Sequence, residues 1–318
     1  MDEAIHLDPS SADAWYNKGL ALYKQRKYKE SIDIEAYNYP SSWILMPLMP
    51  GTTKALLSYS QKKYDEAIEA YDEAIRLNPN LVAAWNNKGN VLNSLGMYDK
   101  AIKVFDEAIR LDPKFADAYN DKGVSLTNQG RYADAIKEYD EAIRLDPKYA
   151  VAWNNKENAL VGQGKYDEAI TALDEAIRLD PKYAEAWSGE GIALMNLAKY
   201  DEAIKAYDTA INLNPNFAAA WSNKGNVLLI QGKYDDAIKN YDEAIRLKPN
   251  LAEAWYNKGN ALGSQGKYDE AIKAFDEAIL LDPNDSDSWY SKGLALEALG
   301  RNTEADAAFA KAKELGAS

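Results

Sequence analysis

The amino-acid sequence predicts an all-α fold in which helix hairpins repeat every 34 residues and stack into a solenoid. Large aromatic residues recur at this interval seven times, from Trp85 to Trp289. Prolines keep the same period, from Pro79 to Pro283, and so do alanines between them. Because one hairpin of this size cannot bury its apolar face alone, neighbouring hairpins are expected to cover it.

Residues 150–183 show how one repeat is expected to fold. A first helix is predicted over 152–163, and it ends at Gly164 because glycine adopts the positive φ of a helix C-terminus at little cost. A second helix is predicted over 166–179, with acidic residues in its first turn and Pro181 after its end. Its apolar residues recur at helical spacing and share one face: Ala169, Leu173, Ala176 and Ile177.

The period divides residues 1–318 into a single array. Residues 1–11 match the end of a preceding repeat, and repeats are expected at 12–45, 48–81 (degraded), 82–115, 116–149, 150–183, 184–217, 218–251, 252–285 and 286–318. From Leu81 onward, each repeat is predicted to form two helices, separated near a glycine or, in one repeat, Ala198. The repeat faces left open at both ends favour end-to-end self-association or a longer parent chain.

Residues 33–57 lose every residue of the pattern and contain three prolines expected to break helices, Pro40, Pro47 and Pro50. We therefore predict irregular structure over 37–51. One interpretation is an insertion, which solenoids tolerate. The other is a frameshift. The codons allowed for residues 43–55, read one nucleotide earlier, permit the repeat-like sequence Leu-Asp-Pro-Tyr-Ala-Ala-Asp-Ala-Trp-Asn-Asn-Lys-Gly.

The repeats closely resemble those of the tetratricopeptide repeat family. Counting the tryptophan as position 4, glycine stands at position 8, alanine at 20 and 27, tyrosine or phenylalanine at 24, and proline at 32; in 116–149 these are Gly123, Ala135, Tyr139, Ala142 and Pro147. Seven consecutive repeats match. The resemblance implies a right-handed superhelical solenoid whose first helices line a concave groove that holds extended peptides.

Two positions depart from the family pattern. Position 7, usually apolar in the family, is a lysine in most repeats; its stem can cover apolar surface while the ammonium reaches water. Position 8 is Glu157 in one repeat. We expect this site to pack more loosely, or its carboxylate to turn toward Lys156 or solvent.

The residue inventory argues against catalysis and against metal or cofactor sites. The chain has no cysteine and a single histidine, His6, so thiolate sites, disulfides and histidine-based triads are excluded. The recurrent Tyr-Asp-Glu-Ala-Ile motif places adjacent carboxylates about 100° apart on a helix, where they cannot share a proton or metal. Asp285-Ser286-Asp287 lacks the rest of a calcium loop and is interpreted as a turn and helix cap. We expect no enzyme and no cofactor.

Charge and hydropathy restrict the partners and the location. The 37 basic and 50 acidic residues give a net charge of −13, which argues against nucleic acid and anionic membranes. No signal peptide is recognisable, and the longest apolar run, residues 43–49, is too short to span a bilayer. A cytoplasmic protein is expected.

The predicted site is the face formed by positions 2, 5, 6, 9, 12 and 13 of the first helices, which the resemblance places in the groove. We expect these helical faces to be exposed. Because asparagine is a poor helix former, its frequency there costs stability and requires an explanation. Its amide can pair with the backbone of an extended peptide. The candidate binding residues are Asn86, Asn87, Asn90, Asn120, Asn154, Asn155, Asn158, Asn223, Asn226, Asn257 and Asn260. The alternative is that duplication copied a harmless residue.

These observations favour a protein-interaction scaffold that binds an extended peptide segment. The family's clamp for acidic C-termini needs lysine at position 5, where none occurs, and position 2 carries Asp117, Glu185, Glu253 and Asp287. Basic or neutral peptides are therefore expected to bind better than acidic ones. Two alternatives stay open: a substrate-recruiting or regulatory fragment of a larger enzyme, and a self-assembling structural array.

Overall fold

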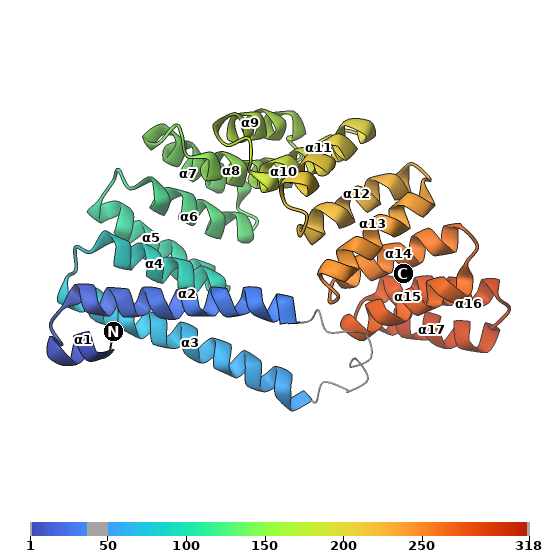
Figure 1. The fold of residues 1–318 in the computed structure, drawn as a ribbon, viewed down its shortest axis with the longest axis horizontal. Coiled ribbons are helices and arrows are strands. Elements are labelled where there is room, and N and C mark those ends of the chain that lie inside the picture. Colours follow the sequence, from blue (N-terminus) through green and yellow to red (C-terminus); the bar gives the residue numbers. More distant parts are fainter. Residues whose placement is uncertain (1, 37–49, 317–318) are drawn as a thin grey trace. The chain divides into compact units, whose positions relative to one another are not determined.

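The computed structural model describes residues 2–36 and 50–316, with side chains in 5–24 and 63–316. These residues form seventeen α-helices, and no strand occurs among them (Figure 1). The predicted all-α fold is confirmed.

The helices follow the chain as α1 (Asp2–Leu7), α2 (Ala12–Ala36), α3 (Pro50–Leu77), α4 (Val82–Ser94), α5 (Tyr98–Leu111), α6 (Ala116–Asn128), α7 (Tyr132–Leu145), α8 (Ala150–Gly162), α9 (Tyr166–Leu179), α10 (Ala184–Asn196), α11 (Tyr200–Leu213), α12 (Ala218–Ile230), α13 (Tyr234–Leu247), α14 (Ala252–Ser264), α15 (Tyr268–Leu281), α16 (Ser286–Ala298) and α17 (Asn302–Glu314).

From α4 onward, every repeat is a helix hairpin. The connection inside most hairpins holds a glycine with positive φ, such as Gly164 at 72°. Ala198 takes the same place with a φ of 58°. The second helices end before the prolines, as α9 does before Pro181. The prediction of two helices per repeat, separated near a glycine or Ala198, is confirmed from Leu81 to the last described repeat, although α8 covers Ala150–Gly162 rather than the predicted 152–163.

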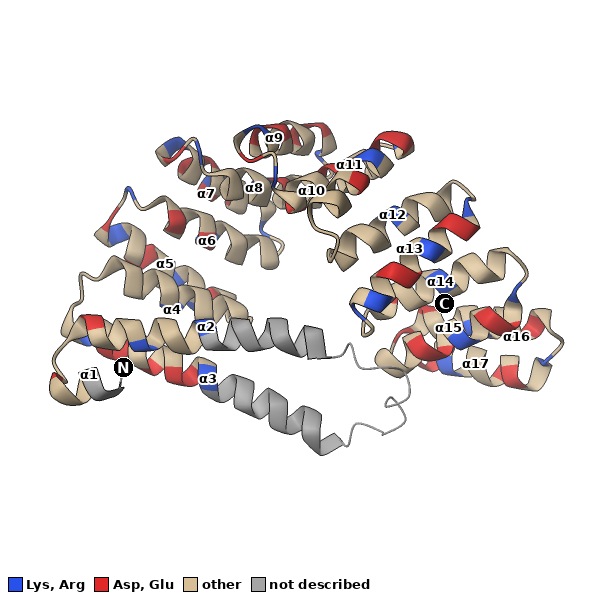
Figure 2. Cartoon of the chain, in the orientation of Figure 1, with Lys and Arg blue, Asp and Glu red and all other residues tan. Residues whose placement is uncertain are grey.

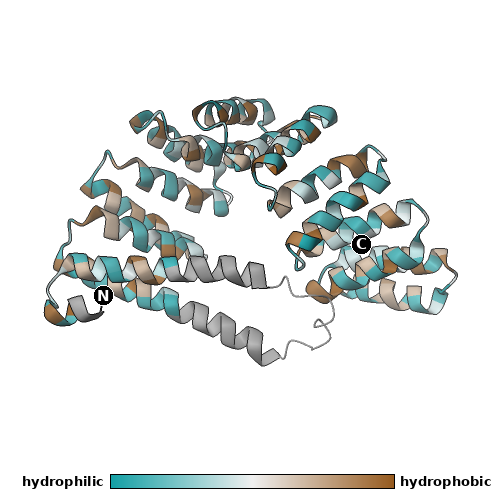
Figure 3. Ribbon diagram, in the orientation of Figure 1, coloured by the Kyte–Doolittle hydropathy of each residue, from teal (hydrophilic) through white to brown (hydrophobic). Residues whose placement is uncertain are grey.

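The chain divides into two compact units, Met1–Pro181 and Lys182–Ser318, which we call unit 1 and unit 2. In unit 1, α4 packs on α5 and α6, α5 on α6, α6 on α7 and α8, and α8 on α9. In unit 2, α10 packs on α11 and α12, and the same pattern continues to α17. Figure 3 shows apolar and hydrophilic residues interspersed along the helices of each unit, as amphipathic helices require. Within each unit the hairpins stack as predicted.

A glycine–aromatic contact joins the two helices of most hairpins. A Cβ added to Gly123 in α6 would lie 2.6 Å from the ring of Tyr139 in α7. That ring is 1% exposed, and Ala135 and Ala142 on the same helix are fully buried. The recurrence of glycine at position 8 and of an aromatic residue at position 24 therefore has one steric cause, because the ring occupies the space of a Cβ.

The α8–α9 hairpin replaces both members of this contact, with Glu157 for glycine and Leu173 for the ring. Glu157 is 3% exposed, and burial raises the pKa of its carboxyl to about 7. Lys156 pairs instead with Asp140, at 2.7 Å. The expectation that Glu157 turns to Lys156 or to solvent is wrong, because the smaller leucine leaves room for the glutamate side chain inside the hairpin.

α2 and α3 are longer than the other helices and pair with each other. Tyr71 of α3 lies against Gly19 of α2, in the contact that the other hairpins make. The predicted irregular structure is wrong at Pro50 and Gly51, where α3 begins; proline fits the first turn of a helix because its missing N–H has no partner there. Residues 37–49 lie outside the described residues, so insertion and frameshift both remain hypotheses.

None of the helices in the described part of the chain combines the length and the hydropathy that crossing a membrane requires.

Candidate functional site

The eleven candidate asparagines all lie on first helices of the repeats but differ in exposure. Asn86, Asn120 and Asn154, all at position 5, are only 5%, 3% and 8% exposed. Asn158 is exposed, and the others are half-buried. The expectation that these faces of the first helices are exposed is therefore wrong at position 5. The position-5 asparagine side chains turn between neighbouring first helices.

Four polar side chains gather in unit 1 where α4 packs on α6. Asn86 and Asn90 of α4 donate their Nδ2–H groups to Oδ2 of Asp121 in α6, at 2.9 and 2.8 Å. Asn120 donates to Oδ1 of Asp121 at 3.1 Å. We call Asn86, Asn90, Asn120 and Asp121 the Asp121 cluster. Burial raises the pKa of the Asp121 carboxyl, and the three amides, which favour its charged form, act against this shift.

The amide bonds continue on both sides of this cluster. Asn155 of α8 donates to Oδ1 of Asn120 at 3.0 Å, and Asn87 of α4 donates to the hydroxyl of Tyr16 at 3.1 Å. The Oδ1 atoms of Asn86 and Asn154 are buried and accept no hydrogen bond within the described residues. Each of five amides thus donates one hydrogen bond inside the protein: Asn86, Asn87, Asn90, Asn120 and Asn155.

Unit 2 has a shorter network. Asn226 of α12 accepts from Asn257 of α14 at 3.0 Å and from the Tyr241 hydroxyl at 2.8 Å. The side chains of Asn223 and Asn260 are half-buried and form no hydrogen bond with any described residue. These two amides are available to a ligand without breaking an internal bond.

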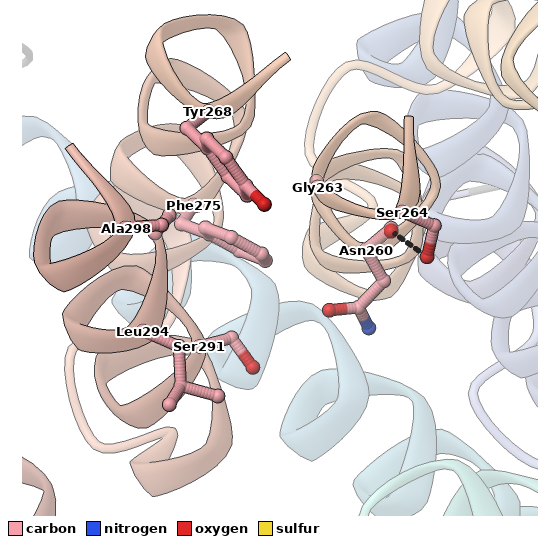
Figure 4. Close-up of a pocket in the computed structure, with 10 residues that line it drawn as sticks. Asn260, Gly263, Ser264, Tyr268, Phe275, Ser291, Leu294 and Ala298 are labelled. Carbon is pink, nitrogen blue, oxygen red and sulfur yellow. Dashed lines mark hydrogen bonds between the residues drawn. The ribbon is translucent and has the colours of Figure 1, made fainter. Parts of the chain in front are cut away.

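A hollow of about 370 Å³ opens beside Asn260, between α14, α15 and α16. In Figure 4 the side chains of Tyr268, Phe275 and Asn260 point toward it. Gly263 lies on its wall, where an added Cβ would meet no atom within 4 Å, and Leu294 is 46% exposed there. The asparagine pattern did not predict Gly263 or Leu294; a glycine inside the predicted first helix was the available signal.

From Lys88 onward, the position-7 lysines form ion pairs with an aspartate of the preceding repeat. Lys122 lies 2.8 Å from Asp106, and Lys258 lies 2.6 Å from Asp242. The Lys258 ammonium also lies 5.3 Å from the ring centroid of Trp255, and its side chain is 22% exposed. The stem therefore covers apolar surface, as expected.

Charge is distributed unevenly between the helices of a hairpin. First helices such as α12 carry few charged residues, and most acids and bases lie on second helices and turns (Figure 2). Asp285 caps α16 by accepting from the Asp287 N–H at 3.2 Å, which confirms the interpretation of this motif as a helix cap. Among the described residues, no group of three or more His, Cys, Asp or Glu could hold a metal ion.

Family models match most of the chain. Those described as tetratricopeptide repeat match residues 1–41, 52–114 and 94–150, 160–226, 252–285 and 274–307, and one described as TPR repeat matches 225–266. A model of anaphase-promoting complex subunit 5 matches 125–184. No match was found among curated proteins.

Solved structures of low identity share the fold. The APC/C hetero-tetramer Cut9–Hcn1 aligns over 80% of this chain with a TM-score of 0.64 and 18% identity. The alignment covers 50% of the matched chain of that assembly, so this chain spans half the length of that relative. A tetratricopeptide repeat protein from Parabacteroides merdae aligns over 77% of this chain and 96% of its own, with a TM-score of 0.60 and 17% identity. Together with the family models, the repeated hairpins and their glycine–aromatic contacts show that the chain belongs to the tetratricopeptide repeat family.

Proposed function

We propose that this chain is a protein-interaction scaffold and that the first helices of its repeats hold an extended segment of a partner protein. The observation that carries the proposal lies in unit 2. Asn223 and Asn260 lie half-buried on first helices with unused amides, and Asn260 borders an open hollow whose walls are partly apolar. An unused amide can pair with a peptide backbone, and the hollow can receive a side chain. The Cut9–Hcn1 assembly, which shares the fold, is itself a protein complex.

The partner segment is basic or neutral rather than acidic. The net charge is −13, and Asp117 and Glu253 lie exposed near the start of first helices. The position-7 lysines, already paired with aspartates, offer little free positive charge to an acidic ligand. Like charges would repel an acidic segment, whereas a basic one gains attraction that salt weakens.

The test is selection of binders to the full chain from a random twelve-residue peptide library, followed by calorimetry with capped synthetic peptides. Replacing both Asn223 and Asn260 by alanine removes two amide pairs, each worth about 0.5–1.5 kcal/mol. Affinity should fall roughly fivefold to 150-fold if both amides engage. The matched control is Asn212→Ala, at an exposed position of the second helix α11.

Two outcomes would contradict the proposal. One is a selection that yields no binding peptide. The other is a set of peptides whose affinity falls with Asn212→Ala but not with the paired change at Asn223 and Asn260.

A further inference from the structure

We propose that Asp121 forms a cation subsite in unit 1, which takes the ammonium group of a lysine side chain in the bound segment. This inference rests on the proposed function and adds to it the chemistry of one residue of the partner.

Asp121 is the only acidic residue at position 6 of the aligned repeats. Position 6 carries an uncharged residue in the other repeats of the pattern: Asn17, Asn87, Asn155, Gly189, Asn223, Asn257 and Ser291. The pattern of the array therefore requires no carboxylate at this position. The acid adds a negative charge to a face whose other polar groups are mostly neutral amides.

No cation neutralises this charge within the described residues. The three neighbours that donate to Asp121 are the amides of Asn86, Asn90 and Asn120. The adjacent lysine, Lys122, is held by two other carboxylates, Asp106 and Glu138, each at 2.8 Å. Burying a carboxylate without a cation beside it is energetically unfavourable. A cation that approaches Asp121 would offset this desolvation free energy, which no cationic side chain among the described residues does.

An unused acceptor adjoins the carboxylate. Asn86 donates to Asp121, yet its own Oδ1 is buried and accepts no hydrogen bond within the described residues. Asn86 is more than nine-tenths buried, at 5% exposure. A buried acceptor without a donor destabilises the fold. The surroundings of Asp121 therefore lack a donor for Asn86, which suits a ligand group that only donates.

The number of free acceptor positions favours an ammonium over a guanidinium. A carboxylate offers about four lone-pair sites. Three sites of Asp121 are used, two on Oδ2 and one on Oδ1. The single site left on Oδ1 cannot receive the two parallel N–H groups of an arginine fork. A lysine ammonium needs one strong acceptor and can direct its other donors to water or amide oxygens.

The experiment takes peptides selected on the full chain and acetylates each lysine in turn, which keeps the side chain but removes its charge. Binding to the wild-type chain and to Asp121→Asn is then measured by fluorescence anisotropy. Acetylation of one lysine should weaken binding to the wild type roughly tenfold, the lower end for a charged hydrogen bond, and leave Asp121→Asn almost unaffected. Replacing that lysine by arginine should restore only part of the loss.

Asp121→Asn is expected to fold, because asparagine stands at five equivalent positions, and Asp121→Ser, which copies the residue at Ser291, is the second variant if it does not. Asp174→Asn removes an exposed charge from the second helix α9 of the same unit and should keep the lysine preference. The inference is overturned if the selected peptides lack lysine, or if acetylation weakens binding to Asp121→Asn as much as to the wild type; the proposed function survives both results. If no peptide binds, the proposed function fails and the inference with it.

Discussion

At the scale of single residues, Glu157 shows how a charged side chain can occupy a position that packing reserves for glycine. The ring at position 24 takes the space of a Cβ at position 8 in the neighbouring hairpins. With Leu173 in place of the ring, this space is free, and the glutamate is buried at 3% exposure. Glutamate at position 157 therefore requires a side chain smaller than an aromatic ring at position 173. Burial also removes water from the Glu157 carboxyl, which is energetically unfavourable.

That cost makes stability depend on pH. In the unfolded chain the Glu157 carboxyl ionises near its ordinary pKa of 4.5, and in the folded chain near 7. Below pH 4.5 both states are protonated. As pH rises from 4.5 to 7, the unfolded chain releases a proton that the folded chain keeps, so the folded state loses about 3 kcal/mol. Urea unfolding of wild type and Glu157→Gln from pH 5 to 8 measures this loss, and parallel profiles for the two proteins would contradict it.

The steric coupling predicts a second result. Leu173→Tyr alone should destabilise the chain by about 1–3 kcal/mol, because the ring would meet the Glu157 side chain. Adding Glu157→Gly restores the pair found in the neighbouring hairpins, and the double variant should recover most of the loss. A double-mutant cycle in urea checks this. Additive effects of the two substitutions would show that residues 157 and 173 do not compete for space.

The residues of the candidate site were only partly predictable. The helical period predicted that the asparagines share one side of the first helices, and in the structure all eleven lie on first helices. Exposure was not predictable, because whether Asn86 faces water or Asp121 depends on how closely α4 and α6 approach. Which amide atoms are free, as in Asn260, also depends on neighbours in other repeats rather than on local sequence.

At the scale of elements, the connection between the two helices of a hairpin contains a residue with positive φ, and a residue with a Cβ is strained there. Ala198 has a φ of 58° where neighbouring hairpins use glycine, and this conformation costs a residue with a Cβ roughly 1–2 kcal/mol. Ala198→Gly removes that cost. It also gives the unfolded chain more conformational entropy, which lowers the free energy of unfolding by about 0.5–1 kcal/mol. A net gain of up to about 1.5 kcal/mol is expected in thermal unfolding.

The matched control is Gly266→Ala, at the same place in another hairpin. Its φ is 76°, and an added Cβ would meet no atom within 4 Å, so only the backbone conformation is altered. This substitution should lower stability by a similar amount. If both changes destabilise the chain, or both stabilise it, the strain at this turn has been assigned wrongly.

The helices themselves were predictable wherever the period is intact. From α4 to α17, glycine, proline and, in the second helices, acidic first turns mark the helix ends locally, so sequence alone sufficed to place the helices. It failed at α3, which begins at Pro50, because a proline can begin a helix as well as end one. The pairing of α2 with α3 depends on Gly19 and Tyr71, which are far apart in the sequence.

At the scale of the whole molecule, stability is expected to come from contacts between adjacent hairpins. In unit 2, from α12 onward, each first helix packs on its own second helix, on the preceding second helix and on neighbouring first helices. The alanine and tryptophan residues at the start of α12 recur in α14, as Ala220 with Trp221 and Ala254 with Trp255. The surface that α12 offers to α11 therefore has a close copy one repeat later.

Deleting residues 218–251 removes α12 and α13 and brings α14 to the place of α12. Because interactions are between neighbours, circular dichroism per residue should stay unchanged, while the urea midpoint falls and the transition broadens. Deleting only 218–233 removes one helix and leaves α13 without its partner, so this shorter deletion should cost more stability than the longer one. A complete loss of helicity on removing the whole repeat, or a smaller cost for the half repeat, would show that the hairpins do not act as the stacking units.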